Sequence, residues 1–232
     1  MYKNLLILLL SILLLFSCSK KKNVELISEP NEEEIAINLY DEAVAALKEG
    51  DAFYAAKKFK EAELLMPKYI WASKASLMAS YSEYSRNNYS NAIFGLERHI
   101  TNYPADENIP YAHYLIAICY YEQILDEKKD LGPLINAKKK FEFIMKTYPN
   151  TDYGTDARFK INLIIDQLAA KEISVARFYM KTEKWIPALN RLKVIVDEYE
   201  TTVFVEEALH RLVEVYYRLG LEEEARQAAA IL

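Results

Sequence analysis

The chain contains few of the residues that break helices or close tight turns. Its 232 residues include 5 glycines and 7 prolines, while 52% are hydrophobic. That balance suits long helices with few tight turns, and the many Ala, Leu, Glu and Lys residues agree with it. So few scattered glycines could hardly build a phosphate cradle, and no G-x-S-x-G, P-loop or dinucleotide fingerprint occurs. Enzyme activity is therefore not expected.

A block of basic residues is also lacking. The 29 Lys and Arg residues are interspersed with 34 Asp and Glu residues, and the formal net charge is −5. A protein that binds nucleic acid usually concentrates basic charge on one face. We therefore expect no nucleic-acid partner.

Histidine and cysteine are equally scarce, with 3 and 2 residues. Only Glu207-x-x-His210 has helical metal-ligand spacing, and a di-iron carboxylate site needs two such motifs and further glutamates. A solvated helix face is the simpler interpretation of this pair. Cys119 lies in an apolar stretch with no histidine within several residues, which predicts a buried structural thiol. We expect no metal, no cofactor and no catalytic residue.

What the chain does carry begins with a targeting signal. Lys3 precedes an apolar run from Leu5 to Phe16. Twelve residues of helix rise about 18 Å, which is too short for a hydrocarbon core of about 30 Å. A basic start, an apolar centre and a polar break predict a secretory signal peptide over residues 1–17.

The signal ends at a cysteine. Leu15-Phe16-Ser17-Cys18 resembles a bacterial lipobox, in which the cysteine is acylated and becomes the first residue of the mature chain. We therefore expect lipidation of Cys18 and a flexible polar tether over residues 18–34, with acyl chains that hold the protein at the membrane. Ser19, where an aspartate would favour inner-membrane retention, resembles enterobacterial signals for the outer membrane. An ordinary signal peptide with an incidental cysteine is the alternative.

An internal repeat predicts the fold. Each copy has a small polar turn, an alanine, two further positions on the same helix face, and often a proline. The copies are Ala55-Phe59-Ala62-Pro67, Ala92-Leu96-His99-Pro104, Ala137-Phe141-Ile144-Pro149, Ala188-Leu192-Ile195 and Ala225-Ala229-Leu232. Small alanines let paired helices approach closely, and one pair cannot cover its own apolar face. We predict an all-α, TPR-type α-solenoid of about five helix-turn-helix repeats.

The repeats also suggest a division of the chain. Upstream partner helices are expected near residues 35–48, 71–85, 111–125, 173–180 and 204–219. Continuous helical periodicity from Thr155 to Met180 predicts one long helix, whose buried stripe comprises Ala157, Ile161, Ile164 and Leu168. We expect an N-terminal half over residues 35–108, with repeats one and two, and a C-terminal half over residues 109–232, with repeats three to five.

Tyrosine is abundant, with 18 residues. In a TPR stack the first helix of each pair lines a concave groove, and the repeat register puts six tyrosines and a leucine on that wall. An aromatic wall suits an extended or aromatic-ended peptide. The alternative is that some of these side chains pack between helices. The predicted groove residues are Tyr40, Leu77, Tyr81, Tyr84, Tyr111, Tyr114 and Tyr121, beside Val44, Leu47 and Ile118.

Several longer runs are more specific than a general TPR pattern. They include Thr147-Tyr148-Pro149-Asn150-Thr151, Lys171-Glu172-Ile173-Ser174-Val175-Ala176-Arg177-Phe178-Tyr179 and Trp185-Ile186-Pro187-Ala188-Leu189-Asn190-Arg191-Leu192. Over nearly the whole mature chain the sequence resembles the BamD family, lipoproteins of the outer-membrane β-barrel assembly (BAM) machine. The segment over residues 201–214 is similar to the alphaproteobacterial branch in particular. Glu200 departs from the pattern, because the other long repeats have proline at that position.

The resemblance implies a non-catalytic scaffold at the periplasmic face of the outer membrane. Its C-terminal half would bind the POTRA domains of an Omp85-type barrel protein, and its N-terminal half would receive unfolded outer-membrane proteins. Other BAM lipoproteins would be further partners. The POTRA-contacting arginine of the family falls on Arg191, beside Asn190. An exposed arginine is also chemically suited to bind a carboxylate, although a merely solvated side chain is the alternative.

Two other functions remain open at this stage. A different periplasmic TPR lipoprotein, for example one that coordinates cell-wall synthesis with envelope constriction, would share the fold. A lipoprotein hydrolase with an unrecognised site would need titratable residues clustered in a pocket, which this sequence does not offer.

Overall fold

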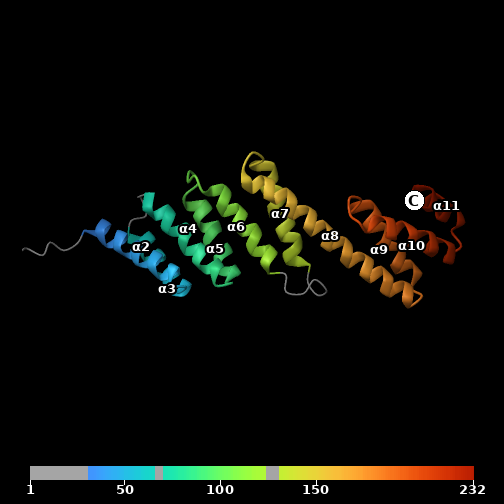
Figure 1. The fold of residues 1–232 in the computed structure, drawn as a ribbon, viewed down its shortest axis with the longest axis horizontal. Coiled ribbons are helices and arrows are strands. Elements are labelled where there is room, and N and C mark those ends of the chain that lie inside the picture. Colours follow the sequence, from blue (N-terminus) through green and yellow to red (C-terminus); the bar gives the residue numbers. More distant parts are fainter. Residues whose placement is uncertain (1–30, 66–69, 124–130) are drawn as a thin grey trace, which may run out of the picture. The chain divides into compact units, whose positions relative to one another are not determined.

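The computed structural model describes residues 31–65, 70–123 and 131–232. The predicted signal peptide, Cys18 and most of the tether lie outside these residues, as does Pro67. All the described helices belong to one compact unit, Glu32–Leu232. Within it the described residues form ten α-helices and no strand (Figure 1). None of these helices is long and apolar enough to cross a bilayer.

The helices pair in sequence order, and each packs against the next one along the chain. This arrangement confirms the predicted all-α, TPR-type fold of five helix-turn-helix repeats, and the long helix expected over Thr155 to Met180 is α8. The five pairs are α2 (Glu32–Lys48) with α3 (Ala52–Leu65), α4 (Ile70–Ser85) with α5 (Tyr89–Asn102), α6 (Ile109–Glu122) with α7 (Gly132–Thr147), α8 (Asp152–Lys181) with α9 (Trp185–Glu198), and α10 (Val205–Arg218) with α11 (Glu222–Ile231).

The turn inside a pair needs a left-handed backbone residue. In four repeats this residue has positive φ: Gly50 at 90°, Asn87 at 61°, Glu183 at 57° and Gly220 at 75°. Glycine and asparagine tolerate this conformation, because their short side chains meet little steric hindrance there. Glu183 is the strained exception among them. The corresponding turn of the third repeat lies outside the described residues.

The turn between pairs is built on a tyrosine. Tyr103, Tyr148 and Tyr199 cap α5, α7 and α9 with φ of −126°, −126° and −125°. The amide of each donates a hydrogen bond to the carbonyl four residues earlier, over 2.8 to 3.0 Å. Proline follows the first two tyrosines but Glu200 follows the third. The missing proline therefore leaves the geometry of the cap at Tyr199 like that of the other two.

The predicted repeat positions form the core of the first four pairs. The first three positions of each of those copies are buried, whereas Pro104 and Pro149 at the ends of two copies are exposed. The stripe of α8 is buried as well. The buried positions are Ala55, Phe59, Ala62, Ala92, Leu96, His99, Ala137, Phe141, Ile144, Ala188, Leu192 and Ile195, with Ala157, Ile161, Ile164 and Leu168. The prediction is wrong for the fifth copy, where Ala228 is buried while Ala229 and Leu232 are exposed. The buried residues of α11 are Ala225 and Ala228, which are three positions apart and share one helix face.

Three hydrophobic clusters follow one another along the helices. The first joins α2, α3 and α4, the second runs from Leu77 to Leu168, and the third begins at Ile173. The second cluster spans the predicted boundary between residues 108 and 109, and the change to the third occurs inside α8. The division into two halves near residue 108 therefore stays a prediction about function.

Candidate binding surfaces

The predicted groove tyrosines are all half-buried, but they do not form one set. Tyr40 lies apart on α2, where its ring is edge-on to Phe59 and Trp71 at centroid distances of 5.1 and 5.4 Å. Leu77 is only 8% exposed and belongs to the second core cluster. Leu77 therefore offers a ligand little surface. The prediction that it is a groove contact is wrong, because the side chain packs in the core.

The remaining five predicted tyrosines join others to form a larger group. We define the tyrosine surface by half-buried side chains on α4, α6 and the starts of α5 and α8. They are Tyr81, Tyr84, Tyr89, Tyr111, Tyr114, Tyr121 and Tyr153. Tyr84 lies between Tyr81 and Tyr89, with ring centroids 6.0 and 6.1 Å away. Tyr153 contacts Tyr111 at 5.8 Å and Tyr114 at 5.2 Å. The rings thus form a broad patch that is apolar on the flat faces and polar at the hydroxyl groups.

Helix α8 contributes polar side chains that the sequence interpretation did not include. The Tyr114 hydroxyl donates a hydrogen bond of 2.6 Å to Asp156, and Lys160 lies over the Tyr121 ring at 5.0 Å. Burial and then this hydrogen bond raise the pKa of Tyr114. Burial, followed by the charges of nearby tyrosines, raises the pKa of Tyr111 to about 12. Both phenols are therefore neutral near pH 7 and act there as hydrogen-bonding groups.

Asn190 and Arg191 lie elsewhere, on the exposed side of α9. Arg191 Nη1 donates to both carboxylate oxygens of Glu172 on α8, at 3.3 and 3.1 Å. Asn190 and Arg191 line a shallow depression of about 240 Å³ together with Tyr179 and Ile186. The structure therefore separates two candidate surfaces, since the tyrosine surface packs on the second core cluster and α9 packs on the third.

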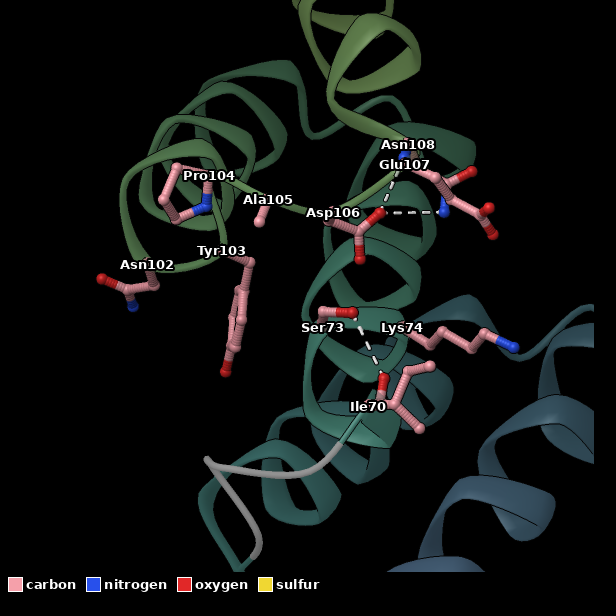
Figure 2. Close-up of a pocket in the computed structure, with 10 residues that line it drawn as sticks. All are labelled: Ile70, Ser73, Lys74, Asn102, Tyr103, Pro104, Ala105, Asp106, Glu107 and Asn108. Atoms are coloured by element: carbon pink, nitrogen blue, oxygen red, sulfur yellow. Dashed lines mark hydrogen bonds between the residues drawn. The ribbon is translucent and has the colours of Figure 1, made fainter.

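A pocket of about 520 Å³ lies between the start of α4 and the turn from α5 to α6. Figure 2 shows Asp106 at its edge, where one carboxylate oxygen accepts hydrogen bonds from the backbone and side chain of Asn108, at 2.7 and 3.0 Å. Ser73 donates to the carbonyl of Ile70 on the opposite wall. These contacts complete local turns, and the pocket was not foreseen because its walls come from segments about 30 residues apart.

The groups considered for metal or nucleophilic chemistry have structural roles. The Glu207 carboxylate accepts hydrogen bonds from Arg177 and Arg211, and Arg177 first and then Arg211 lower its pKa to about 2. His210 is exposed and Cys119 is fully buried, where burial raises the thiol pKa to about 12. No group of His, Cys, Asp or Glu in the described part of the chain could hold a metal ion.

One histidine occupies a core position. His99 stands where other repeats have Ile144 and Ile195, and it is fully buried. Neither ring nitrogen has a hydrogen-bond partner among the described residues, and burial lowers its pKa. The neutral ring therefore packs as a core side chain, tilted against Tyr103 at a centroid distance of 5.5 Å.

Comparison with known proteins shows to which family the chain belongs. The profile of the family described as YfiO, outer membrane lipoprotein, matches residues 32–231, which include every described helix. The chain belongs to this family. The resemblance to BamD proteins noted in the sequence is confirmed, because curated relatives at 39% and 36% identity carry the name outer membrane protein assembly factor BamD.

These relatives come from alphaproteobacteria, in line with the resemblance seen at residues 201–214. The Caulobacter vibrioides protein is 39% identical over 194 residues, which cover 84% of this chain and 64% of that protein. The Rickettsia prowazekii protein is 36% identical over 220 residues, 95% of this chain and 86% of that protein. A solved TPR-like repeat structure, a putative kinesin light chain of Podosopora anserina, is 12% identical and covers 86% of this chain and 93% of its own, but its TM-score of 0.39 supports no argument.

Proposed function

We propose that the chain is a non-catalytic lipoprotein that assists the assembly of β-barrel proteins at the periplasmic face of the cell outer membrane. The observation that carries this proposal is the similarity to a relative named outer membrane protein assembly factor BamD, at 36% identity over 95% of the chain. Acyl chains on Cys18 would hold the protein at the membrane. Its helices would then act as a scaffold with a high effective concentration near a membrane-embedded partner.

The two candidate surfaces give the scaffold two roles. The tyrosine surface would receive unfolded outer-membrane proteins, since rigid aromatic rings with polar tips bind extended chains at low entropic cost. Asn190 and Arg191 would contact the POTRA domains of an Omp85-type barrel protein. Other BAM lipoproteins would complete the assembly. No step in this function requires bond breaking, a cofactor or a metal.

The decisive experiment is affinity purification of the full-length lipoprotein from solubilised membranes, followed by mass spectrometry. We expect an Omp85-type barrel protein to be the dominant partner. In the same experiment Arg191→Glu should lower its recovery at least roughly tenfold, because a repelled carboxylate costs more than 1.4 kcal/mol at a contact. Lys193→Glu, the same charge change two residues along α9, is the control. Recovery of cell-wall or division proteins in place of a barrel protein would overturn the proposal.

A second expected result concerns the tyrosine surface. Changing Tyr81 and Tyr114 together to alanine should weaken the binding of an unfolded outer-membrane protein peptide roughly tenfold, since each lost ring removes an aromatic contact. Fluorescence anisotropy of the labelled peptide measures the effect. Tyr217→Ala, which removes a 71% exposed tyrosine of α10, serves as the control. Unchanged affinity in a folded double variant would show that these rings serve packing alone.

A further inference from the structure

Helices α3 and α5 carry a third surface, which the proposed function does not use. A groove of about 380 Å³ opens there over α4, with Leu64 on its α3 side and Phe94 on its α5 side. Gly95 lets α5 approach α4 closely, because a Cβ atom on Gly95 would lie 2.5 Å from the hydroxyl oxygen of Ser80. We call this groove and its rims the α3–α5 surface; its residues are Phe53, Lys57, Lys60, Leu64, Arg86, Phe94 and Arg98.

Large apolar side chains on this surface are exposed to solvent. Phe53 and Leu64 stand at the two ends of one face of α3, and Lys60 and Lys57, which is paired with Glu61, lie between them. The exposed fractions of the apolar residues are 65% for Phe53, 73% for Leu64 and 71% for Phe94. Exposed apolar side chains that gather on one surface mark sites of contact with a protein or a membrane. Basic residues interleaved with Phe and Leu are typical of helices that lie at a membrane interface.

The charges of the α3–α5 surface are arranged with the cations outermost. Glu83, at the floor of the groove, accepts a hydrogen bond of 2.9 Å from Lys60 and is also paired with Arg86. Its side chain is only 7% exposed, and Glu63, the partner of Arg98, is only 5% exposed. The three basic side chains are between 35% and 48% exposed. An approaching molecule therefore meets cations and apolar groups, and an anionic amphiphile is complementary to both.

The proposed anchor would bring such an amphiphile within reach. Acyl chains on Cys18 would lie in the bilayer, and thirteen residues, 19–31, separate Cys18 from the start of α2. Thirteen residues span at most about 45 Å even when fully extended. Since α3 packs directly against α2, the bilayer has a high effective concentration at the α3–α5 surface.

We infer that the α3–α5 surface binds the face of a phospholipid bilayer, with Leu64 and Phe94 inserted between the lipids and the basic side chains at anionic head groups. This inference rests on the proposed function, because acylation of Cys18 brings the bilayer near. It extends that function by giving the anchored protein a fixed orientation, which acyl chains on a tether do not provide. None of its residues belongs to the tyrosine surface, so contact with the bilayer does not occupy that surface.

The first test measures co-sedimentation of the mature chain with phospholipid vesicles, with Cys18→Ser so that no acyl chain contributes. Binding to vesicles of equal parts phosphatidylcholine and phosphatidylglycerol should be at least roughly tenfold stronger than to phosphatidylcholine alone. Replacing Leu64 and Phe94 together by serine should weaken it at least roughly tenfold. The matched control is the double change Phe159→Ser and Tyr217→Ser, at 60% and 71% exposed positions of α8 and α10, which should stay within about twofold because neither residue belongs to this surface. Unchanged thermal unfolding midpoints establish that the variants fold.

The second test uses the acylated chain in the same vesicles. Phe94→Cys introduces a thiol for an environment-sensitive dye, since acyl chains block Cys18 and Cys119 is fully buried. Tyr217→Cys is the control, because Tyr217 has the same exposed fraction of 71%. The dye at position 94 should emit at shorter wavelength and be quenched by brominated phospholipid, whereas the dye at position 217 should show neither change.

The outcomes separate the inference from the proposed function. Equal losses in the two double variants, or equal dye emission at the two positions, overturn the inference, because membrane contact is then not confined to the α3–α5 surface. If the unchanged chain does not bind vesicles but still co-purifies with a barrel protein, the inference fails and the proposed function stands. If mass spectrometry of the mature chain shows no acylation of Cys18, both fail. If the change of Leu64 and Phe94 converts a dimer to a monomer, the surface serves self-association and the inference is overturned.

Discussion

Replacing Phe141 by alanine is expected to lower the free energy of unfolding by about 3–5 kcal/mol. The Phe141 side chain is fully buried on α7 and belongs to the second core cluster. Its ring contacts those of Tyr114 and Tyr121 edge-on, at centroid distances of 6.0 and 6.4 Å. The substitution removes the transfer free energy of the ring and leaves a cavity that close-packed neighbours fill only in part.

Urea unfolding followed by circular dichroism measures this change, provided the slope with denaturant stays constant. The control is Phe143→Ala on the same helix, where the side chain is 43% exposed and a loss of about 1 kcal/mol or less is expected. The Phe141 variant should also bind peptide more weakly, because two rings of the tyrosine surface lose their support. A loss below about 1.5 kcal/mol would contradict the view that this ring fills the core beneath that surface.

Replacing Arg98 by alanine is expected to cost roughly 3 kcal/mol, the lower end of the range for breaking a buried ion pair. Its partner Glu63 has a side chain that is only 5% exposed, and the carboxylate also accepts a hydrogen bond of 3.3 Å from Tyr103. Without the guanidinium, this buried carboxylate would lose its ion pair and retain the phenol of Tyr103 as a donor. The arginine itself is 35% exposed, which reduces the penalty relative to a fully buried pair.

A double-mutant cycle isolates the cause of that loss. Adding Glu63→Gln to Arg98→Ala should recover most of the stability, since a neutral amide is far less costly to leave buried than a lone charge. Arg226→Ala is the surface control: Arg226 is 72% exposed and pairs with Glu222 and Glu223, and the expected change is within roughly 0.5 kcal/mol. If Arg98→Ala is as mild as the control, the pairing of Arg98 with Glu63 does not stabilise the fold.

Features set by repetition within one helix were predictable from the sequence. Alanine and its partners four and seven positions later share a helix face, so the cores of the first four repeats followed from spacing alone. The same register put Tyr81, Tyr84, Tyr111 and Tyr114 on corresponding faces of α4 and α6, where the structure brings them near one another. The prediction was wrong at the last helix, where Ala228 is buried and Ala229 and Leu232 are exposed.

Features that depend on two distant segments were not predictable. Tyr153, Asp156 and Lys160 reach the tyrosine surface only because α8 packs beside α6 and α7. The pairing of Arg191 with Glu172 joins two helices across a turn, and a single sequence contains no signal for it. The tyrosine caps did have a signal, since Tyr103, Tyr148 and Tyr199 each follow the repeat at a fixed distance. The repeat pattern used for the prediction included the proline that follows Tyr103 and Tyr148 but not the tyrosines themselves.

The position of α8 has a consequence for how the protein is made. Its first part, to Leu168, completes the second core, whereas Ile173, Ala176 and Met180 belong to the third. The chain is synthesised from its N-terminus. Once the first part of α8 has been made, the helices before it have all their packing partners. The second part of α8 then shows an uncovered apolar stripe until α9 and α10 arrive. A chain that ends within the third core would therefore expose the apolar residues Ile173, Ala176 and Met180 to solvent.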